Sequence, residues 1–133
     1  ASYNMAASVT LITAQRLVRC LCPRCKESVS LSAEVLLKAG LPPDWLTADA
    51  VEVFSPVGCA HCHKGFAGRT GIFQVMPVSA DIQALILRDA DHQALARQAQ
   101  HEGVGSLRLA GLRKVLQGIT SLDEVLATTR HGA

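Results

Sequence analysis

The feature that most constrains the fold of this chain is a pair of Cys-x-x-Cys motifs. Cys22 and Cys25 enclose one motif, Cys59 and Cys62 enclose the other, and 33 residues lie between the two pairs. Each motif lets two thiolates point at one ion, and two such turns complete the tetrahedral sulfur site that suits zinc. The sequence therefore predicts a structural Zn2+ site. Because four thiolates leave no open coordination position, we expect the metal to stabilise the fold and not to catalyse a reaction.

Other interpretations of the cysteines stay open at this point. The four could form two disulfides, "CPRC" could be a redox dithiol, or His61 or His63 could replace one cysteine as a ligand. Five cysteines are an odd number, and the first residues lack the basic region and cleavage site of a signal peptide, so a reducing compartment fits better. A redox dithiol should open a helix after a strand, whereas we expect a helix before this motif. Cys20 is the spare cysteine, expected to be a small buried side chain.

Composition sets broad limits on the class of protein. The 133 residues suit one domain, or one core with a small satellite. Aromatic residues are 4% of the chain, so the core must consist mainly of Leu, Val, Ile and Ala. The net charge of +2 comes from basic residues scattered among eleven acidic ones, which is a poor signal for nucleic-acid binding. The sequence contains no run of about 18 apolar residues, which is the length that would predict a membrane span. The chain lacks an initiator Met, and we expect it to begin within a longer protein.

Apolar spacing predicts a mainly α chain with a small β component, that is, an α+β fold. Helical spacing of Leu11, Ala14, Val18 and Leu21 predicts a helix over 8–21, capped by Ser8. A short helix is expected over 32–39, ended by Gly40. Segments 51–54 and 71–78 read as strands.

From Ser79 onward the pattern predicts a bundle of three to four short antiparallel helices. The expected helices begin at capping residues and end near glycines, and Ser121 with Glu124 has the spacing of a capping box. The remaining expected caps are Ser79, Asp91 and Ser106. We further expect that loss of the metal would loosen residues 22–76 and spare the helices after 79.

The sequence shows no catalytic set. It lacks a P-loop, an H-E-x-x-H motif and a G-x-S-x-G motif. Arg16 and Arg19 share one face of the expected first helix, and Arg69 projects from the glycine turn in "GFAGRTGIF". The ordinary interpretation of these arginines is a solvated face or a surface ion pair. The alternative is a contact with a neighbouring subunit or with nucleotide phosphate.

Three segments, in order, resemble one family. "NMAASVTLITAQRLVRCLCPRCK" resembles the end of the motor domain in the secretion ATPases of type IV pilus assembly and type II secretion. "GCAHCHKGFAGRTGIFQVMPV" is similar to their second cysteine pair with the following Gly-Arg-Thr-Gly-Ile segment, and "GSLRLAGLRKVLQGITSLDEVLATT" is similar to their C-terminal helices. The similarity covers nearly the whole chain, and "NMAASVTLI" favours the pilus extension motor over the type II secretion ATPase.

The resemblance implies a hexameric cytoplasmic ATPase with a RecA-like motor, peripheral at the bacterial inner membrane. Such an enzyme would dock on a platform protein of that membrane and power pilin polymerisation or type II protein secretion. The four cysteines would match the family's zinc-binding tetracysteine motif. The Mg-ATP site with its Walker A lysine would lie before Ala1, so we expect a structural and coupling role here and no ATP hydrolysis. We expect neither nucleic-acid binding nor membrane insertion.

The resemblance also implies a division of the chain. Residues 1–21 would end the RecA-like motor core, 22–78 would form the tetracysteine subdomain, and 79–133 would form the C-terminal helical subdomain. Two functions of other classes compete with this one. A stand-alone nucleic-acid-binding zinc module would need a continuous basic stripe and a salt-dependent affinity. A Cys-x-x-Cys redox protein would need a reactive cysteine of low pKa.

Overall fold

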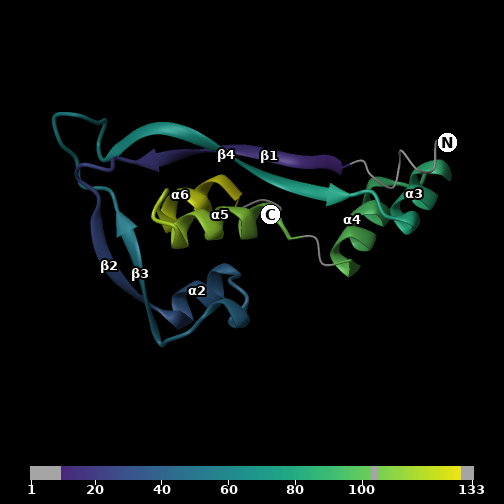
Figure 1. The fold of residues 1–133 in the computed structure, drawn as a ribbon, viewed down its shortest axis with the longest axis horizontal. Helices are drawn as coiled ribbons and strands as arrows, with labels where there is room; N and C mark the ends of the chain where they lie inside the picture. Colours follow the sequence, from purple (N-terminus) through teal and green to yellow (C-terminus); the bar gives the residue numbers. More distant parts are fainter. Residues whose placement is uncertain (1–9, 103–104, 130–133) are drawn as a thin grey trace. The chain divides into compact units, whose positions relative to one another are not determined.

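The structure, a computed structural model, describes residues 10–102 and 105–129 (Figure 1). These residues form four strands, β1 (Thr10–Leu21), β2 (Glu27–Ser32), β3 (Ala50–Ser55) and β4 (Phe66–Pro77). Its α-helices are α2 (Ala33–Ala39), α3 (Ala80–Leu87), α4 (His92–His101), α5 (Leu107–Leu116) and α6 (Leu122–Thr129). One turn of 3-10 helix spans Pro43–Trp45. The described part of the chain is therefore α+β, as expected, with two two-stranded sheets.

The helix expected over 8–21 is wrong, because residues Thr10–Leu21 form strand β1, which pairs with β4. The proposed cap, Ser8, lies outside the described residues. Apolar residues at helical spacing made the helix plausible, but Ile12, Thr13 and Val18 are β-branched and suit a strand. A long strand from a distant part of the sequence decided the outcome, since tertiary pairing overrides a weak local preference. β4 is itself longer than the strand expected over 71–78.

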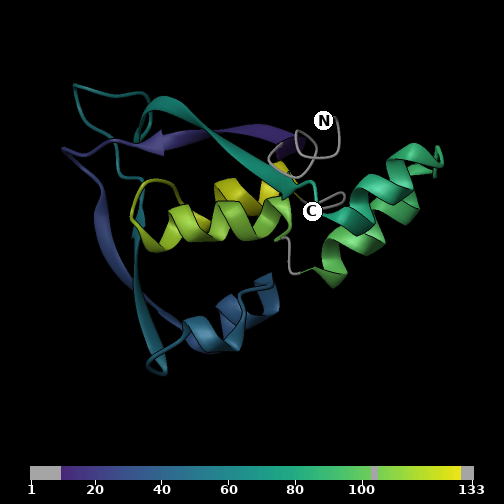
Figure 2. The ribbon, with the colours of Figure 1, turned by 45° about the vertical axis from the view of Figure 1, so that its right-hand side comes forward.

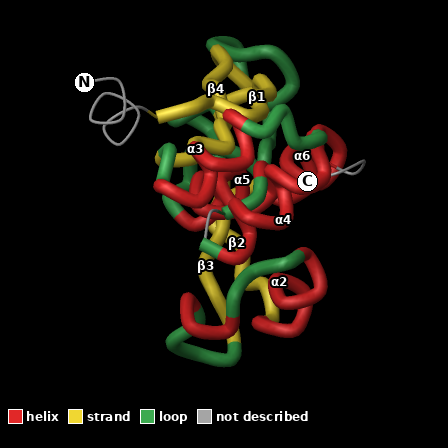
Figure 3. Tube along the Cα trace, turned by 90° about the vertical axis from the view of Figure 1, so that its right-hand side faces the viewer, coloured by secondary structure: helices red, strands yellow, loops and turns green. Residues whose placement is uncertain are grey.

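The second sheet is an antiparallel ribbon of β2 and β3, with Glu27 opposite Ser55 at one end and Ser32 opposite Ala50 at the other. Figure 3 shows the two strands side by side with α2 near them. β3 contains the expected strand 51–54, whereas β2 was not predicted. α2 matches the expected helix, and Gly40 ends it with a left-handed φ of 111°. This conformation suits glycine and lets its N–H reach the last helical carbonyls.

The C-terminal helices begin at most of the predicted caps. Ser79 accepts a hydrogen bond from the N–H of Ile82, and Asp91 accepts one from the N–H of Ala94. The helices pack in two pairs, α3 with α4 and α5 with α6, and α5 also contacts β3. The single expected bundle is thus replaced by two helical hairpins, because α5 and α6 bury their apolar sides against another part of the chain.

The residues group into two compact units, each discontinuous in sequence. One comprises Ala1–Gln15 with Phe73–Ser106 and holds the α3–α4 hairpin; we call it the hairpin unit. The other comprises Arg16–Ile72 with Leu107–Ala133 and holds the four predicted cysteine ligands; we call it the cysteine unit. The expected division into 22–78 and 79–133 follows the sequence order, whereas these units interleave the two segments.

Each unit has its own apolar core. In the hairpin unit, Met76, Val78, Ile82 and Ala99 are buried together. In the cysteine unit, α2 and β3 pack against α5 and α6. Figure 2 shows α5 and α6 lying side by side. The buried residues of this second core are Leu36, Ala39, Leu41, Val53, Leu112, Val115 and Val125. Since α5 and α6 complete the core of the cysteine unit, they belong to its fold.

Candidate metal centre

The four predicted ligands converge at the ends of the strands. Cys22 follows β1 directly and Cys25 precedes β2, while Cys59 and Cys62 lie between β3 and β4. All four sulfur atoms lie within 4.8 Å of one another. The Cys22 and Cys59 sulfurs are 3.8 Å apart, and the Cys25 sulfur and the Cys59 sulfur are each 3.7 Å from that of Cys62. Two turns that are 33 residues apart in sequence therefore form one sulfur cluster.

These separations match the shape of a zinc tetrathiolate. A Zn–S bond of about 2.3 Å in a tetrahedral site places neighbouring sulfurs about 3.8 Å apart. A disulfide would require about 2.05 Å, and all five cysteines are free thiols. The donor set is also suitable, because soft thiolates select zinc over hard cations. The four residues thus fit a tetrahedral metal ion in both spacing and chemistry.

Backbone N–H groups point at the sulfurs. The N–H of Gly58 donates to the sulfur of Cys25 at 3.3 Å, and the N–H of Cys59 donates to the sulfur of Cys62 at 3.3 Å. The N–H of His61 donates to the sulfur of Cys59 at 3.4 Å. These donors favour thiolates over thiols, since they stabilise negative charge.

The thiols do not ionise independently. Burial opposes ionisation of Cys22, but N–H groups of Arg24 and Cys25 and the adjacent thiols lower its pKa to about 7. The N–H of His61 favours the thiolate of Cys59, but burial and the three neighbouring thiols raise its pKa to about 11. A first negative charge at Cys22 therefore makes further charges in the cluster costly, a penalty that a divalent cation would remove.

The surroundings of the cluster bear on the other interpretations of the cysteines. Among the described residues, the group that could hold an ion consists of four cysteines and no histidine, and both His61 and His63 are exposed. The first motif lies between strands β1 and β2, so it does not open a helix as a thioredoxin-like dithiol would. Cys20 is half-buried on β1 and lies outside the cluster.

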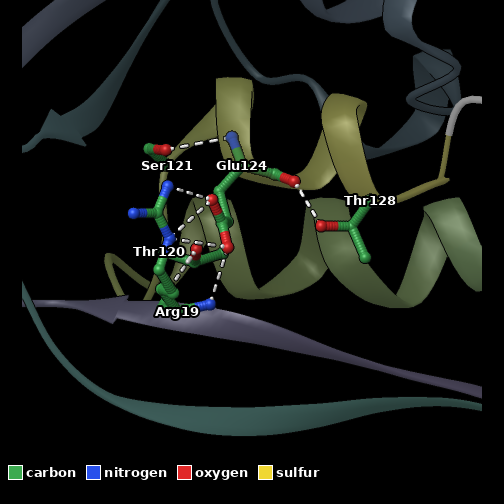
Figure 4. A network of polar contacts seen from close by, with 5 residues as sticks. All are labelled: Arg19, Thr120, Ser121, Glu124 and Thr128. Carbon is green, nitrogen blue, oxygen red and sulfur yellow. Dashed lines mark hydrogen bonds and ion pairs between the residues drawn. The ribbon is translucent and has the colours of Figure 1, made fainter.

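Arg19 is held by an internal network (Figure 4). Its backbone N–H donates to Glu124 at 2.9 Å, and its guanidinium donates to the same carboxylate at 2.8 to 3.2 Å. The hydroxyl of Thr120 donates to the carbonyl of Arg19 at 2.7 Å. The guanidinium also lies 4.1 Å from the ring centroid of Phe66. The Glu124 side chain thereby clamps β1 to the start of α6.

The network corrects part of the predicted capping box. The hydroxyl of Ser121 accepts the N–H of Glu124 at 3.1 Å, as a capping box requires. The carboxylate of Glu124, which would complete the box by reaching back, is committed to Arg19 instead. Glu124 and Thr120 are therefore structural residues that sequence reasoning missed, although the capping spacing drew attention to Glu124.

Lys26 joins the cysteine turns to the helices. Its ammonium donates to the carbonyl of Gly118 at 2.9 Å and lies 4.7 Å from the ring centroid of Phe54. Nearby, the N–H of Leu21 donates to the carbonyl of Ile119 at 2.8 Å. The segment that links α5 to α6 thus lies along the chain that leads into the first cysteine turn.

The other two arginines are exposed. Arg16 and Arg19 do not share a helix face, because both lie on β1 and are three residues apart, a spacing that places side chains on opposite faces of a strand. Arg69 lies on β4, next to Gly68, whose φ is 79°. A role of these arginines in subunit or phosphate contacts stays a prediction.

The family model for "Type II/IV secretion system protein" matches residues 1–127, so the chain belongs to this family. None of the helices in the described residues is long and apolar enough to cross a membrane.

Curated relatives include type IV pilus assembly ATPases and type II secretion proteins. The type IV pilus assembly ATPase PilB of Pseudomonas aeruginosa is 43% identical over 129 residues, and that of Acinetobacter baylyi is 41% identical over 129 residues. Type II secretion system protein E of Pseudomonas aeruginosa is 36% identical over 130 residues. Each alignment covers 97% of this chain, but the chain spans only 22% of the length of the pilus proteins and 25% of that of the secretion protein.

Proposed function

We propose that Cys22, Cys25, Cys59 and Cys62 hold one structural Zn2+. The proposal rests on the convergence of four sulfurs within 4.8 Å of one another, three of the separations being 3.7 to 3.8 Å, with backbone N–H groups directed at them. The ion supplies a cross-link between β1–β2 and β3–β4. Such a link is useful here because the unit has few aromatic residues and a modest core.

Elemental analysis and a thiol count on the native protein test this metal site. We expect one zinc per chain and one reactive thiol or none, since only Cys20 lies outside the cluster. Absence of metal with five reactive thiols would overturn the zinc site. Absence of metal with one thiol would instead indicate two disulfides and would argue against a cytoplasmic location.

We further propose that the chain is part of a hexameric cytoplasmic ATPase that powers type IV pilus assembly or type II protein secretion. Family membership and the greater identity to pilus assembly ATPases support this, with the pilus motor favoured. The catalytic Mg-ATP site lies in other parts of such an enzyme, in its RecA-like motor core. The assembled enzyme is peripheral at the inner membrane through a platform protein.

Within that enzyme these residues are structural and coupling elements. The Arg19–Glu124 clamp and the Lys26–Gly118 contact tie strand β1 and the cysteine turns to the last two helices. A displacement of β1 would therefore be passed to α5 and α6 as a rigid movement. This arrangement supports a role in transmitting motor motion to a partner surface.

A chimera tests the coupling role. We would replace the matching residues of the Acinetobacter baylyi PilB with this chain and measure pilus assembly in cells that lack the native protein. We expect restored piliation, and loss of piliation with retained protein level when Cys59 is changed to Ser. A chimera that hydrolyses ATP and still assembles pili after the Cys59→Ser change would contradict the coupling role of the metal centre.

A further inference from the structure

Charged residues are segregated along the cysteine unit. Residues 16–26 and 53–72 hold six basic residues and no acidic residue, whereas residues 27–52 hold five acidic residues and one basic residue. The first group stays positive even after the two net negative charges of a zinc tetrathiolate are subtracted. The modest net charge of the whole chain, +2, conceals this segregation.

Three of the basic residues are available to a partner, and we call Arg24, Lys64 and Arg69 the basic face. All three are exposed, and among the described residues none is engaged in an ion pair or a side-chain hydrogen bond. Arg24 lies inside the first cysteine turn and Lys64 follows the second. The two turns are held together, because their sulfurs lie within 4.8 Å of one another and the N–H of Cys22 donates to the carbonyl of Gly65 at 2.9 Å.

Four of the five acidic residues of 27–52 lie away from the cysteine turns, whereas Glu27 is exposed opposite Ser55, at the end of the β2–β3 ribbon next to them. Glu52 is opposite Ser30, and the other three exposed acids lie on α2 or on the chain that returns from it to β3. We call these residues the acidic end: Glu34, Asp44, Asp49 and Glu52. The cysteine turns adjoin the Glu27–Ser55 end of the ribbon, while α2 begins directly after Ser32 at the opposite end (Figure 1).

The ribbon keeps the two charged regions apart. Glu52 lies three residues from Ser55, about 10 Å along β3 at about 3.3 Å per residue, and the other members of the acidic end follow beyond the ribbon. Among the described residues, no ion pair joins the basic face to the acidic end. Each region also exposes apolar side chains that could form the centre of a contact: Val57 (55% exposed) beside the cysteine turn, and Val35 (43%) and Leu37 (41%) on α2.

We propose that the basic face of one copy binds the acidic end of a second copy of this chain. Charge complementarity favours this head-to-tail arrangement, because contacts between two basic faces or two acidic ends would be repulsive. The contact joins different surfaces of the two copies, so it can repeat around a ring. The inference specifies a contact between subunits of the hexamer in the proposed function, and it rests on that part of the proposed function alone. Exposed charges contribute little each, so the contact of isolated chains is weak and is destroyed by salt.

Sedimentation of the zinc-loaded protein at rising concentration tests the contact. At about 10 mM salt, where the screening length is about 30 Å, we expect the average mass to rise above that of a monomer. At about 1 M salt, where screening acts within about 3 Å, we expect a monomer. A monomer at both salt concentrations, up to the solubility limit, would overturn the proposal.

Charge reversal makes the test specific. One variant combines Arg24→Glu, Lys64→Glu and Arg69→Glu, and another combines Asp44→Lys, Asp49→Lys and Glu52→Lys. We expect each variant to be monomeric at low salt, because its face and its end then carry charge of the same sign. An equimolar mixture should associate, because the unreversed acidic end of the first variant matches the unreversed basic face of the second. A matched control, Asp81→Lys with Asp89→Lys in the hairpin unit, should associate like the natural chain.

Zinc content and circular dichroism of each variant keep failures distinguishable. A variant that binds one zinc, keeps its helicity and still self-associates would overturn the proposed surfaces but not the metal site. Association of both variants that is unchanged by salt would also overturn the proposal. If the natural chain stays monomeric yet binds vesicles of anionic lipid through the basic face, the partner is a membrane surface and the self-contact is wrong.

Discussion

Arg19 and Glu124 form a bidentate ion pair between strand β1 and helix α6, 105 residues apart in sequence, with a closest N–O distance of 2.8 Å. The carboxylate also accepts the backbone N–H of Arg19. The Glu124 side chain is 11% exposed, whereas that of Arg19 is 51% exposed. The pair is therefore shielded on the side of the acid, where the loss of a partner is most costly.

Changing Glu124 to Gln should lower the free energy of unfolding by about 1–2 kcal/mol, because a neutral amide cannot accept the same charge-assisted hydrogen bonds. Urea unfolding followed by circular dichroism measures the change. Glu34→Gln is the matched control, since Glu34 pairs with Lys38 at 3.7 Å with both side chains 78% exposed. Its effect should be close to zero. Equal effects of the two substitutions would show that the Arg19–Glu124 pair contributes no more to the free energy of unfolding than an exposed ion pair.

The same pair should make stability depend on acidity. The hydrogen bond from Arg19 lowers the pKa of Glu124 below its ordinary value of 4.5. The unfolded carboxyl therefore takes up its proton at a higher pH than the folded one, and the stabilisation is complete above about pH 4.5. It is lost as the pH falls through the lowered folded pKa. Unfolding curves of the natural chain and of Glu124→Gln should thus converge toward low pH, and a constant separation would contradict this.

Gly111 permits the close approach of α5 and α6. A Cβ at this position would lie 2.6 Å from Cγ1 and 3.1 Å from Cγ2 of Val125, which is fully buried. Gly111→Ala should lower the free energy of unfolding by about 1–3 kcal/mol from overpacking, despite the better helix propensity of Ala. Val125→Ala should partly rescue it, so the double variant should be less destabilised than the sum of the single changes. Additive effects would exclude a direct clash.

Asp91 should matter only to the helical hairpin. Its carboxylate accepts the N–H of Ala94 at 2.8 Å and caps α4. Asp91→Ala should cost about 1 kcal/mol and increase amide exchange in α3 and α4. Asp123→Ala is the control, because this exposed acid in the first turn of α6 supports its helix only through the dipole. Increased exchange in α5 and α6 after the Asp91 change would contradict the separation of the two cores.

Metal removal should loosen the cysteine unit and spare the hairpin unit. The sequence alone suggested that all helices after residue 79 would be spared, but α5 and α6 share a core with α2 and β3. Chelation, or Cys59→Ser, should therefore raise hydrogen exchange in β2, β3, α5 and α6, while the buried Ile82 and Ala99 keep α3 and α4 protected. Exchange that rises equally in α3 and α4 would show a single cooperative unit.

Local features were predictable because each depends on neighbours in sequence. The caps at Ser79 and Asp91 need only a side-chain oxygen three residues before an N–H, and Gly40 and Gly118 end helices because glycine adopts a positive φ at little cost. The convergence of the four cysteines was predictable for a similar reason. A Cys-x-x-Cys spacing is a local geometry, and two copies of it leave few other arrangements.

Only the tertiary structure decided the rest. The apolar spacing in residues 10–21 suited a helix, and the pairing with β4, more than 40 residues away, made it a strand. Glu124 had the spacing of a capping residue, but the approach of β1 gave its carboxylate a charged partner with more donors. α5 and α6 belong to the cysteine unit because their apolar sides find α2 and β3. Sequence patterns determine what a segment can form locally, whereas the free energy gained by long-range pairing and burial selects among those options.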